Sequence, residues 1–186
     1  IAVNQRDELV ETRFGDHLEQ LNRILSGFFA KPWKSLPTFV FGHSFGGILA
    51  LEMLRRQGPK TGVNWAGLVL MSPAFEPAGR RGQGLESALA SGGWQFLQKG
   101  RASRLFRPVS RVLSAVDYDF DVTWGNQFVS DQPAENLLVD EDPLNRASFP
   151  TPYLGPIIEG VLETEQKDWS FLPDTLLLLP GRDGIV

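Results

Sequence analysis

The chain has 186 residues, a formal net charge of −4, 42% hydrophobic residues and no cysteine. A chain of this length is usually one domain and can bury a substantial core. The slight acidity disfavours a nucleic-acid-binding protein, which would normally carry a basic face. The lack of cysteine excludes a disulfide scaffold, a thiolate zinc site and a cysteine nucleophile, and two histidines are too few for a His-rich metal site. We therefore expect neither a metal nor a cofactor.

Targeting signals and membrane spans are not evident in the sequence. The longest pure leucine run, Leu176 to Leu179, is far shorter than the roughly 20 apolar residues that a membrane helix needs. The first residues do not have the pattern of a secretory signal. We expect a cytoplasmic or peripheral membrane location.

The first half of the chain shows alternating helix and strand patterns. A helix is predicted near Asp16 to Phe29, because apolar residues recur there at three- and four-residue spacing: Leu18, Leu21, Ile24, Leu25 and Phe28. The apolar run Thr38 to Phe41 lacks polar alternation, which suits a strand buried on both faces of a parallel sheet. Ile48 to Gln57 is predicted to be a helix that Gly58 and Pro59 stop.

Two further buried strands are predicted, Gly67 to Met71 and Leu176 to Leu179, closed by Ser72-Pro73 and Pro180-Gly181. Three strands with helical connections indicate an α/β architecture. The stretch between the second and third strands is far too long for a simple connection. We therefore predict a core of residues 1–73 and 175–186, interrupted by an inserted cap of residues 74–174.

The predicted cap is unevenly charged. Residues 80–111 hold seven basic residues and one acid, whereas residues 117–142 hold eight acids and no Lys or Arg. Two interpretations stay open. The two faces are solvated and pair with each other, or the basic face meets an anionic lipid surface. Apolar residues interleaved with the basic ones keep the second interpretation open: Trp94, Phe96, Leu97, Leu105 and Phe106.

Residues 42–47, Gly-His-Ser-Phe-Gly-Gly, contain the G-x-S-x-G pattern of a nucleophile elbow. The pattern predicts a strand that turns sharply into a helix, with Ser44 exposed at the apex in a strained conformation. Gly42 and Gly46 would remove side chains that clash where strand and helix cross. The backbone N–H of Phe45 would be one oxyanion donor at the positive end of the helix. The alternative is a glycine-rich turn in which Ser44 caps the helix.

Residues 37–47 resemble the elbow of α/β-hydrolases, and more narrowly that of the monoacylglycerol lipase and lysophospholipase group. Residues 68–74 are similar to the family's next strand and its Ser-Pro exit, and residues 142–144 resemble a motif near the end of its cap. Residues 176–186 resemble the strand and loop that present the catalytic acid. This resemblance, over residues 16–186, implies a partial α/β-hydrolase fold: a parallel sheet with flanking helices and an inserted, mostly helical cap.

The family's chain order is Ser, then acid, then His. The resemblance implies that Asp183 is the acid, which would fix the tautomer of the imidazole and stabilise the imidazolium. An ordinary turn aspartate at this position and Glu76 as a rival acid are the alternatives. No histidine follows Asp183. His17 is expected to be a surface residue, and His43 is expected to pack or hydrogen-bond under the elbow.

The missing base has two explanations, a piece of a longer chain or a degenerate, non-catalytic hydrolase fold. We favour the piece, with the catalytic histidine beyond residue 186, so the 186 residues alone should be nearly inactive although the parent protein is an enzyme. We expect a serine hydrolase that cleaves carboxylic esters of lipid-like substrates, monoacylglycerols or lysophospholipids, through an acyl-enzyme. An aminopeptidase, a C–C hydrolase and a non-catalytic binding protein are the alternatives.

The expected partners are a small-molecule acyl ester or lipid substrate and, through the cap, a membrane surface in transient contact, but no nucleic acid. Aromatic residues of the cap suit either an acyl-chain pocket or plain core packing: Trp94, Phe96, Phe106, Phe120, Trp124 and Phe128.

Overall fold

The computed structural model describes residues 6–29, 35–75, 111–112, 115–122, 130, 132–142, 148–165 and 167–179. The chain divides into two compact units. The first, which we call the sheet unit, consists of residues 14–75 and 160–181. The second, the hairpin unit, consists of residues 1–13, 76–159 and 182–186.

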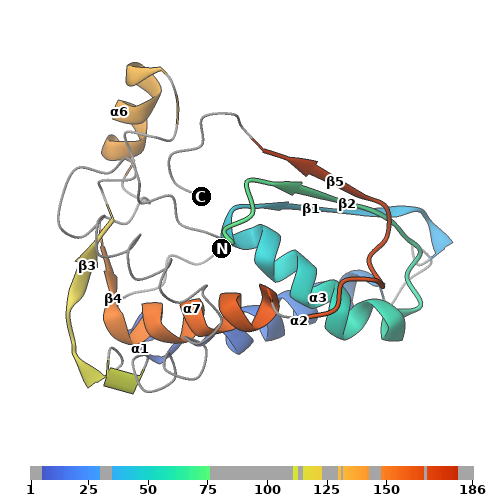
Figure 1. Cartoon of the computed structure of the whole chain (residues 1–186), viewed down its shortest axis with the longest axis horizontal. Coiled ribbons are helices and arrows are strands. Elements are labelled where there is room, and N and C mark those ends of the chain that lie inside the picture. The colour runs from blue at the N-terminus through green and yellow to red at the C-terminus, as the bar shows by residue number, and fades with distance from the viewer. Residues whose placement is uncertain are drawn as a thin grey trace. The chain divides into compact units, whose positions relative to one another are not determined.

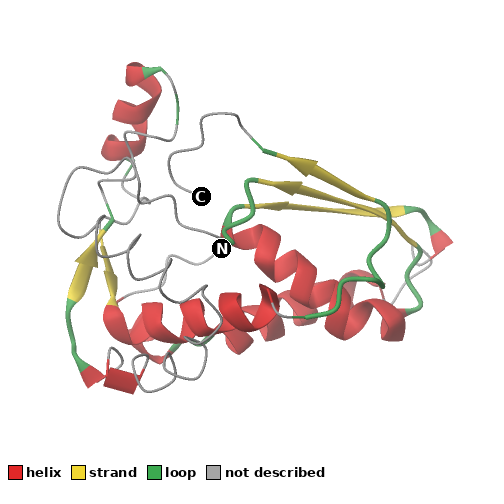
Figure 2. Ribbon diagram, viewed as in Figure 1, coloured by secondary structure: helices red, strands yellow, loops and turns green. Residues whose placement is uncertain are grey.

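A parallel three-stranded sheet forms the centre of the sheet unit (Figures 1 and 2). Its order is β1 (Thr38–His43), β2 (Trp65–Met71) and β5 (Thr175–Leu178). In the register, Phe41 pairs with Val69 and Met71 pairs with Leu178. The three predicted strands and their parallel arrangement are confirmed, and so is the α/β fold class.

Two helices pack on one side of this sheet. α3 (Phe45–Thr61) contacts β1 and β2, and α2 (Phe14–Phe29) packs against α3 (Figure 1). The core between these elements is made of aliphatic side chains that are at most 5% exposed: Leu18, Ile48, Leu51, Leu54, Leu68 and Leu70. The predicted stripe of α2 is narrower than expected, because Ile24 is 63% exposed.

The opposite side of the sheet is exposed, so the prediction of strands buried on both faces was wrong for β1 and β5. Phe39 and Phe41 are 68% and 62% exposed, and Leu176 is 54% exposed. Side chains alternate between the two faces of a strand. Gly42 faces α3, whereas Phe39 and Phe41 point to the face that neither α2 nor α3 covers.

α3 is longer than the sequence predicted. It begins at Phe45, continues past Gly58 and Pro59, and ends at Thr61. Gly62 has a φ of 63°, the left-handed conformation that commonly follows a helix and suits glycine. The carbonyl of Gly58 accepts hydrogen bonds from the Trp65 indole and the Thr61 hydroxyl, both at 3.3 Å. A proline in the last turn therefore does not stop this helix.

The described part of the hairpin unit contains α1 (Arg6–Glu11), β3 (Asp119–Asp121), α6 (Pro133–Glu141) and β4 (Ser148–Pro150). β3 and β4 pair in antiparallel fashion, with Phe120 opposite Phe149. α7 (Thr151–Glu165) follows β4, and the boundary between the two units falls within this helix, after Glu159. None of the helices in the described ranges is both long and apolar enough to cross a membrane.

Candidate active site

Ser44 lies at the turn between β1 and α3. Its φ of 51° and ψ of −128° are unusual for a residue with a side chain. The residue is partly exposed, and its hydroxyl makes no capping hydrogen bond to α3. The alternative of a capping serine therefore does not describe this position. A sharp strand-to-helix turn with a strained serine at its apex is the geometry of a nucleophile elbow.

Backbone hydrogen bonds fix both the N–H and the carbonyl of Ser44. The Ser44 N–H donates to the carbonyl of Met71 at 3.0 Å. The Ser44 carbonyl accepts from the N–H groups of Gly47, at 2.9 Å, and Ala74, at 3.1 Å. Because both peptide groups of the residue are hydrogen-bonded, the strained conformation is fixed by its surroundings.

Glycines allow the strand and helix to approach each other at this turn. A Cβ on Gly42 would lie 2.6 Å from the Cα of Gly47 and 2.9 Å from the carbonyl oxygen of Gly46. A Cβ on Gly47 would lie 3.0 Å from the Cβ of Pro73. A Cβ on Gly46 would meet nothing within 4 Å. The expected steric requirement is therefore present at Gly42, but the second tight position is Gly47 rather than Gly46.

Phe45 is the first residue of α3, where backbone N–H groups have no partner within the helix. Its ring packs edge-on against two residues from the first turn of α2. The ring centroids lie 6.0 Å from that of Phe14 and 5.7 Å from that of His17. The residue whose N–H is the candidate oxyanion donor is thus anchored through its side chain.

Both histidines differ from their sequence-based predictions. His17 is half-buried against Phe45 rather than on the surface. Burial lowers the pKa of His17 below its ordinary value, and the charge of Asp16 opposes that shift only in part. His43 is exposed and does not pack under the elbow. Since Gly42 faces α3, the next residue of the strand must face the open side of the sheet.

Several predicted residues lie outside the described ranges. These include both candidate acids, Asp183 and Glu76, and five of the six cap aromatics: Trp94, Phe96, Phe106, Trp124 and Phe128. The sixth, Phe120, lies in β3 and is partly exposed. β5 ends at the same edge of the sheet as β1 and β2, which is the edge where Ser44 lies.

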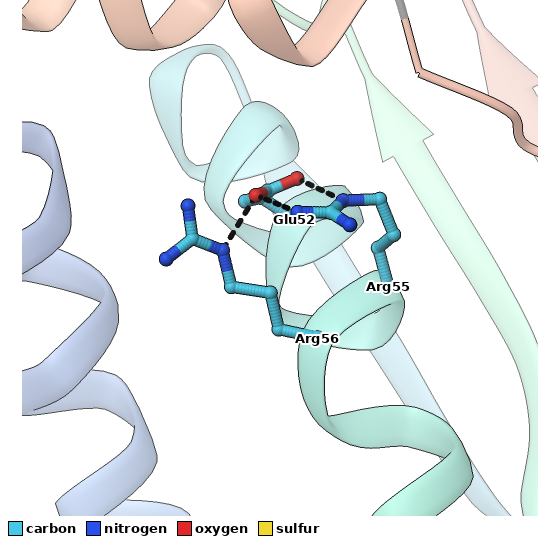
Figure 3. A network of polar contacts seen from close by, with 3 residues as sticks. All are labelled: Glu52, Arg55 and Arg56. Carbon is cyan, nitrogen blue, oxygen red and sulfur yellow. Dashed lines mark hydrogen bonds and ion pairs between the residues drawn. The ribbon is translucent and has the colours of Figure 1, made fainter.

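A buried carboxylate lies further along the helix that begins at the elbow (Figure 3). Glu52 is 2% exposed and accepts hydrogen bonds from Arg55, at 2.5 and 2.7 Å, and from Arg56, at 2.5 Å. Burial alone would raise the pKa of Glu52, but these hydrogen bonds and the two positive charges outweigh it, and the pKa lies below its ordinary value. This cluster neutralises a charge within α3 and was not predicted from the sequence.

Other candidate sites are few in the part of the chain that the structure describes. No group of three or more His, Cys, Asp or Glu side chains there could hold a metal ion. A pocket of about 260 Å³ is lined by Leu54, Gly58, Trp65, Phe171 and Pro173. Trp65 begins β2, so this pocket lies at the edge of the sheet opposite to Ser44 and does not belong to the candidate active site.

Comparisons with known proteins agree with this geometry. The crystal structure of the Paleococcus ferrophilus monoacylglycerol lipase is similar to this chain, with a TM-score of 0.60 and 15% sequence identity. The similarity covers 90% of this chain and 54% of the lipase chain, so this chain spans about half the length of that protein. No curated protein sequence matches. The profile of the family described as serine aminopeptidase, S33, matches residues 8–186, and the chain therefore belongs to this family of α/β-hydrolases.

Proposed function

We propose that this protein is a serine hydrolase that cleaves carboxylic esters of lipid-like substrates through an acyl-enzyme on Ser44. The strained, uncapped and partly exposed Ser44 at the start of α3 is the observation that carries the proposal. A lipase of similar fold supports an ester substrate, and monoacylglycerols or lysophospholipids are the substrates we propose.

In the proposed reaction, the Ser44 hydroxyl oxygen attacks the ester carbonyl carbon while an imidazole base takes its proton. The oxyanion accepts a hydrogen bond from the Phe45 N–H at the amino end of α3. The ester C–O bond then breaks, and the imidazolium returns the proton to the leaving alcohol. Water repeats the sequence on the acyl-enzyme and releases the carboxylic acid. We assign the acid to Asp183 and the base to a histidine outside the 186 residues.

The cap belongs to the same proposal. Residues 74–174 would cover the site and shape the acyl pocket, and their basic part would touch a membrane surface transiently. A cytoplasmic or peripheral membrane location is consistent with such a substrate. The 186 residues without a base would keep only the slow turnover that binding and oxyanion stabilisation supply.

Labelling of the natural-length protein with a fluorophosphonate probe tests the nucleophile. We expect one labelled serine, and we expect Ser44→Ala to abolish the label. The proposal would be wrong if the Ser44→Ala variant were still labelled, or if the unmutated protein were not labelled at all. Ser170→Ala is a matched control, since Ser170 lies in an exposed turn and bonds only to Asp168 in the described structure.

Amide hydrolysis is the second candidate, because the family is described as one of serine aminopeptidases. The same nucleophile and oxyanion donor serve both bonds, and the leaving group differs. A panel of monoacylglycerol, lysophosphatidylcholine, p-nitrophenyl esters and aminoacyl amides separates the two. We expect turnover of the esters. Turnover of amides alone would assign the protein to peptide chemistry instead.

A further inference from the structure

Gly46 is a glycine that the packing of the elbow does not require. It is the second residue of α3 and is exposed. A Cβ added there would meet nothing within 4 Å in the described structure, whereas a Cβ on Gly47 would press on Pro73. The backbone of Gly46 is helical, and glycine is less favourable than alanine in a helix. The missing side chain therefore calls for a reason other than packing.

The place of Gly46 on α3 determines where a side chain would point. The Cα–Cβ bonds of a helix tilt toward its N-terminus, so each side chain covers the surface on the N-terminal side of its own Cα. For the second residue of α3, that surface is the elbow at Ser44 and the N–H of Phe45. A side chain at Gly46 would therefore lean toward the space where the reacting carbonyl lies in the proposed reaction.

We propose that Gly46 is a specificity-determining residue, whose missing side chain leaves room for the acyl group next to the reacting carbonyl carbon. This inference rests on the proposed function, because it concerns the substrate of the same nucleophile. Glycine is the usual residue where the backbone must come close to a ligand. The open space at Gly46 implies that the site accepts acyl groups with a branch on the carbon next to the carbonyl, in addition to straight chains.

Two p-nitrophenyl esters, the acetate and the isobutyrate, measure this room because they differ in bulk next to the carbonyl. We expect the natural-length protein to hydrolyse both. Gly46→Ala puts a methyl group into the open space, and one carbon typically changes discrimination about 10–200-fold. We therefore expect kcat/KM for the isobutyrate, relative to the acetate, to fall by about tenfold or more in Gly46→Ala. An unchanged ratio would overturn the proposal, and so would an unmutated protein that hydrolyses only the acetate.

Gly27→Ala is the matched control. Gly27 is an exposed glycine of α2, and its added Cβ would also meet nothing within 4 Å in the described structure. Both substitutions introduce a better helix former, so both variants should melt close to the unmutated protein. Only Gly46→Ala should change the ratio of the two esters. A large fall in the melting temperature of Gly46→Ala would show that another part of the natural-length protein fills the space, and would overturn the proposal.

The inference and the proposed function fail in different ways. If fluorophosphonate does not label the unmutated protein, both fall together. If it labels Ser44 and the ratio of the two esters is the same with and without Gly46→Ala, the serine hydrolase assignment stands and the role of Gly46 falls alone.

Discussion

The imidazole of His17 meets the ring of Phe45 edge-on, at a centroid distance of 5.7 Å and an interplanar angle of 81°. This contact joins the first turn of α2 to the residue that follows Ser44. A neutral imidazole packs well against an aromatic ring, whereas the protonated form must stay hydrated. The contact therefore depends on the protonation state of His17.

The lowered pKa of His17 predicts a pH-dependent stability. A group whose pKa is lower in the folded than in the unfolded chain contributes full stability above its unfolded value, 6.5. That contribution is lost as the pH falls through the folded value. Urea midpoints measured between about pH 7.5 and 5.5 should fall for the unmutated chain and change less for His17→Leu. An equal fall in both would contradict the prediction. His43→Gln, at an exposed position, is the control and should keep the fall.

Gly42→Ala is expected to disrupt the elbow. Its Cβ would overlap the Cα of Gly47, which is backbone and cannot swing away. Overpacking of this kind typically costs about 1–3 kcal/mol or more. Thermal unfolding and fluorophosphonate labelling should both show the loss. Gly46→Ala has open space around its Cβ, and we expect its melting temperature to stay close to that of the unmutated chain. Equal effects of the two variants would contradict this steric account.

Glu52→Gln should destabilise the sheet unit, because two arginines then surround a neutral amide. Arg55 and Arg56 are 31% and 46% exposed, so solvent screens part of the loss, and we expect about 1–2 kcal/mol. The lowered pKa of Glu52 adds a pH signature. Its stabilisation is present above 4.5, its unfolded value, and is lost as the pH falls through the folded value. Chemical denaturation should therefore show that the free energies of unfolding of the unmutated chain and of Glu52→Gln converge as the pH is lowered from neutral to acidic. A gap that is independent of pH would contradict the assignment.

Gly160→Ala should destabilise the packing of α7 on α2. A Cβ there would lie 2.2 Å from the Cγ and 2.6 Å from the Cβ of Phe14, atoms too close to the backbone to move freely. We expect a loss of about 1–3 kcal/mol in thermal unfolding. Phe14→Ala in the same chain should recover part of it, since alanine lacks the Cγ that the new Cβ would approach most closely. A double variant no better than the sum of the single variants would argue against this contact.

Local sequence patterns predicted the strands and the sharp turn at Ser44 because those signals are short-range. The apolar runs of β1, β2 and β5 and the Gly-x-Ser-x-Gly spacing lie within a few residues of the structures that they specify. The end of α3 was missed for a different reason. Gly58 and Pro59 are helix breakers on average. Here the Gly58 carbonyl accepts a hydrogen bond from the Trp65 indole N–H, and Gly62 adopts the left-handed conformation that ends the helix.

Features that depend on partners far along the chain could not be predicted from local patterns. The tight position at Gly47 is set by Pro73, and the burial of His17 is set by Phe45. Ser72 was identified in the sequence only as part of a strand exit, because neither its positive φ nor its buried hydroxyl has a compositional signal. The exposure of His43 could have been deduced by counting one residue from Gly42 along an alternating strand.

The open face of the β1-β2-β5 sheet affects how the 186-residue polypeptide will behave during purification. Exposed phenylalanine rings on β1 and exposed leucines on β5 make this face apolar, and the three strands contain no charged residue. Exposed apolar patches of this kind promote self-association. Ammonium sulfate should therefore precipitate this polypeptide readily, and mild detergent should keep it dispersed.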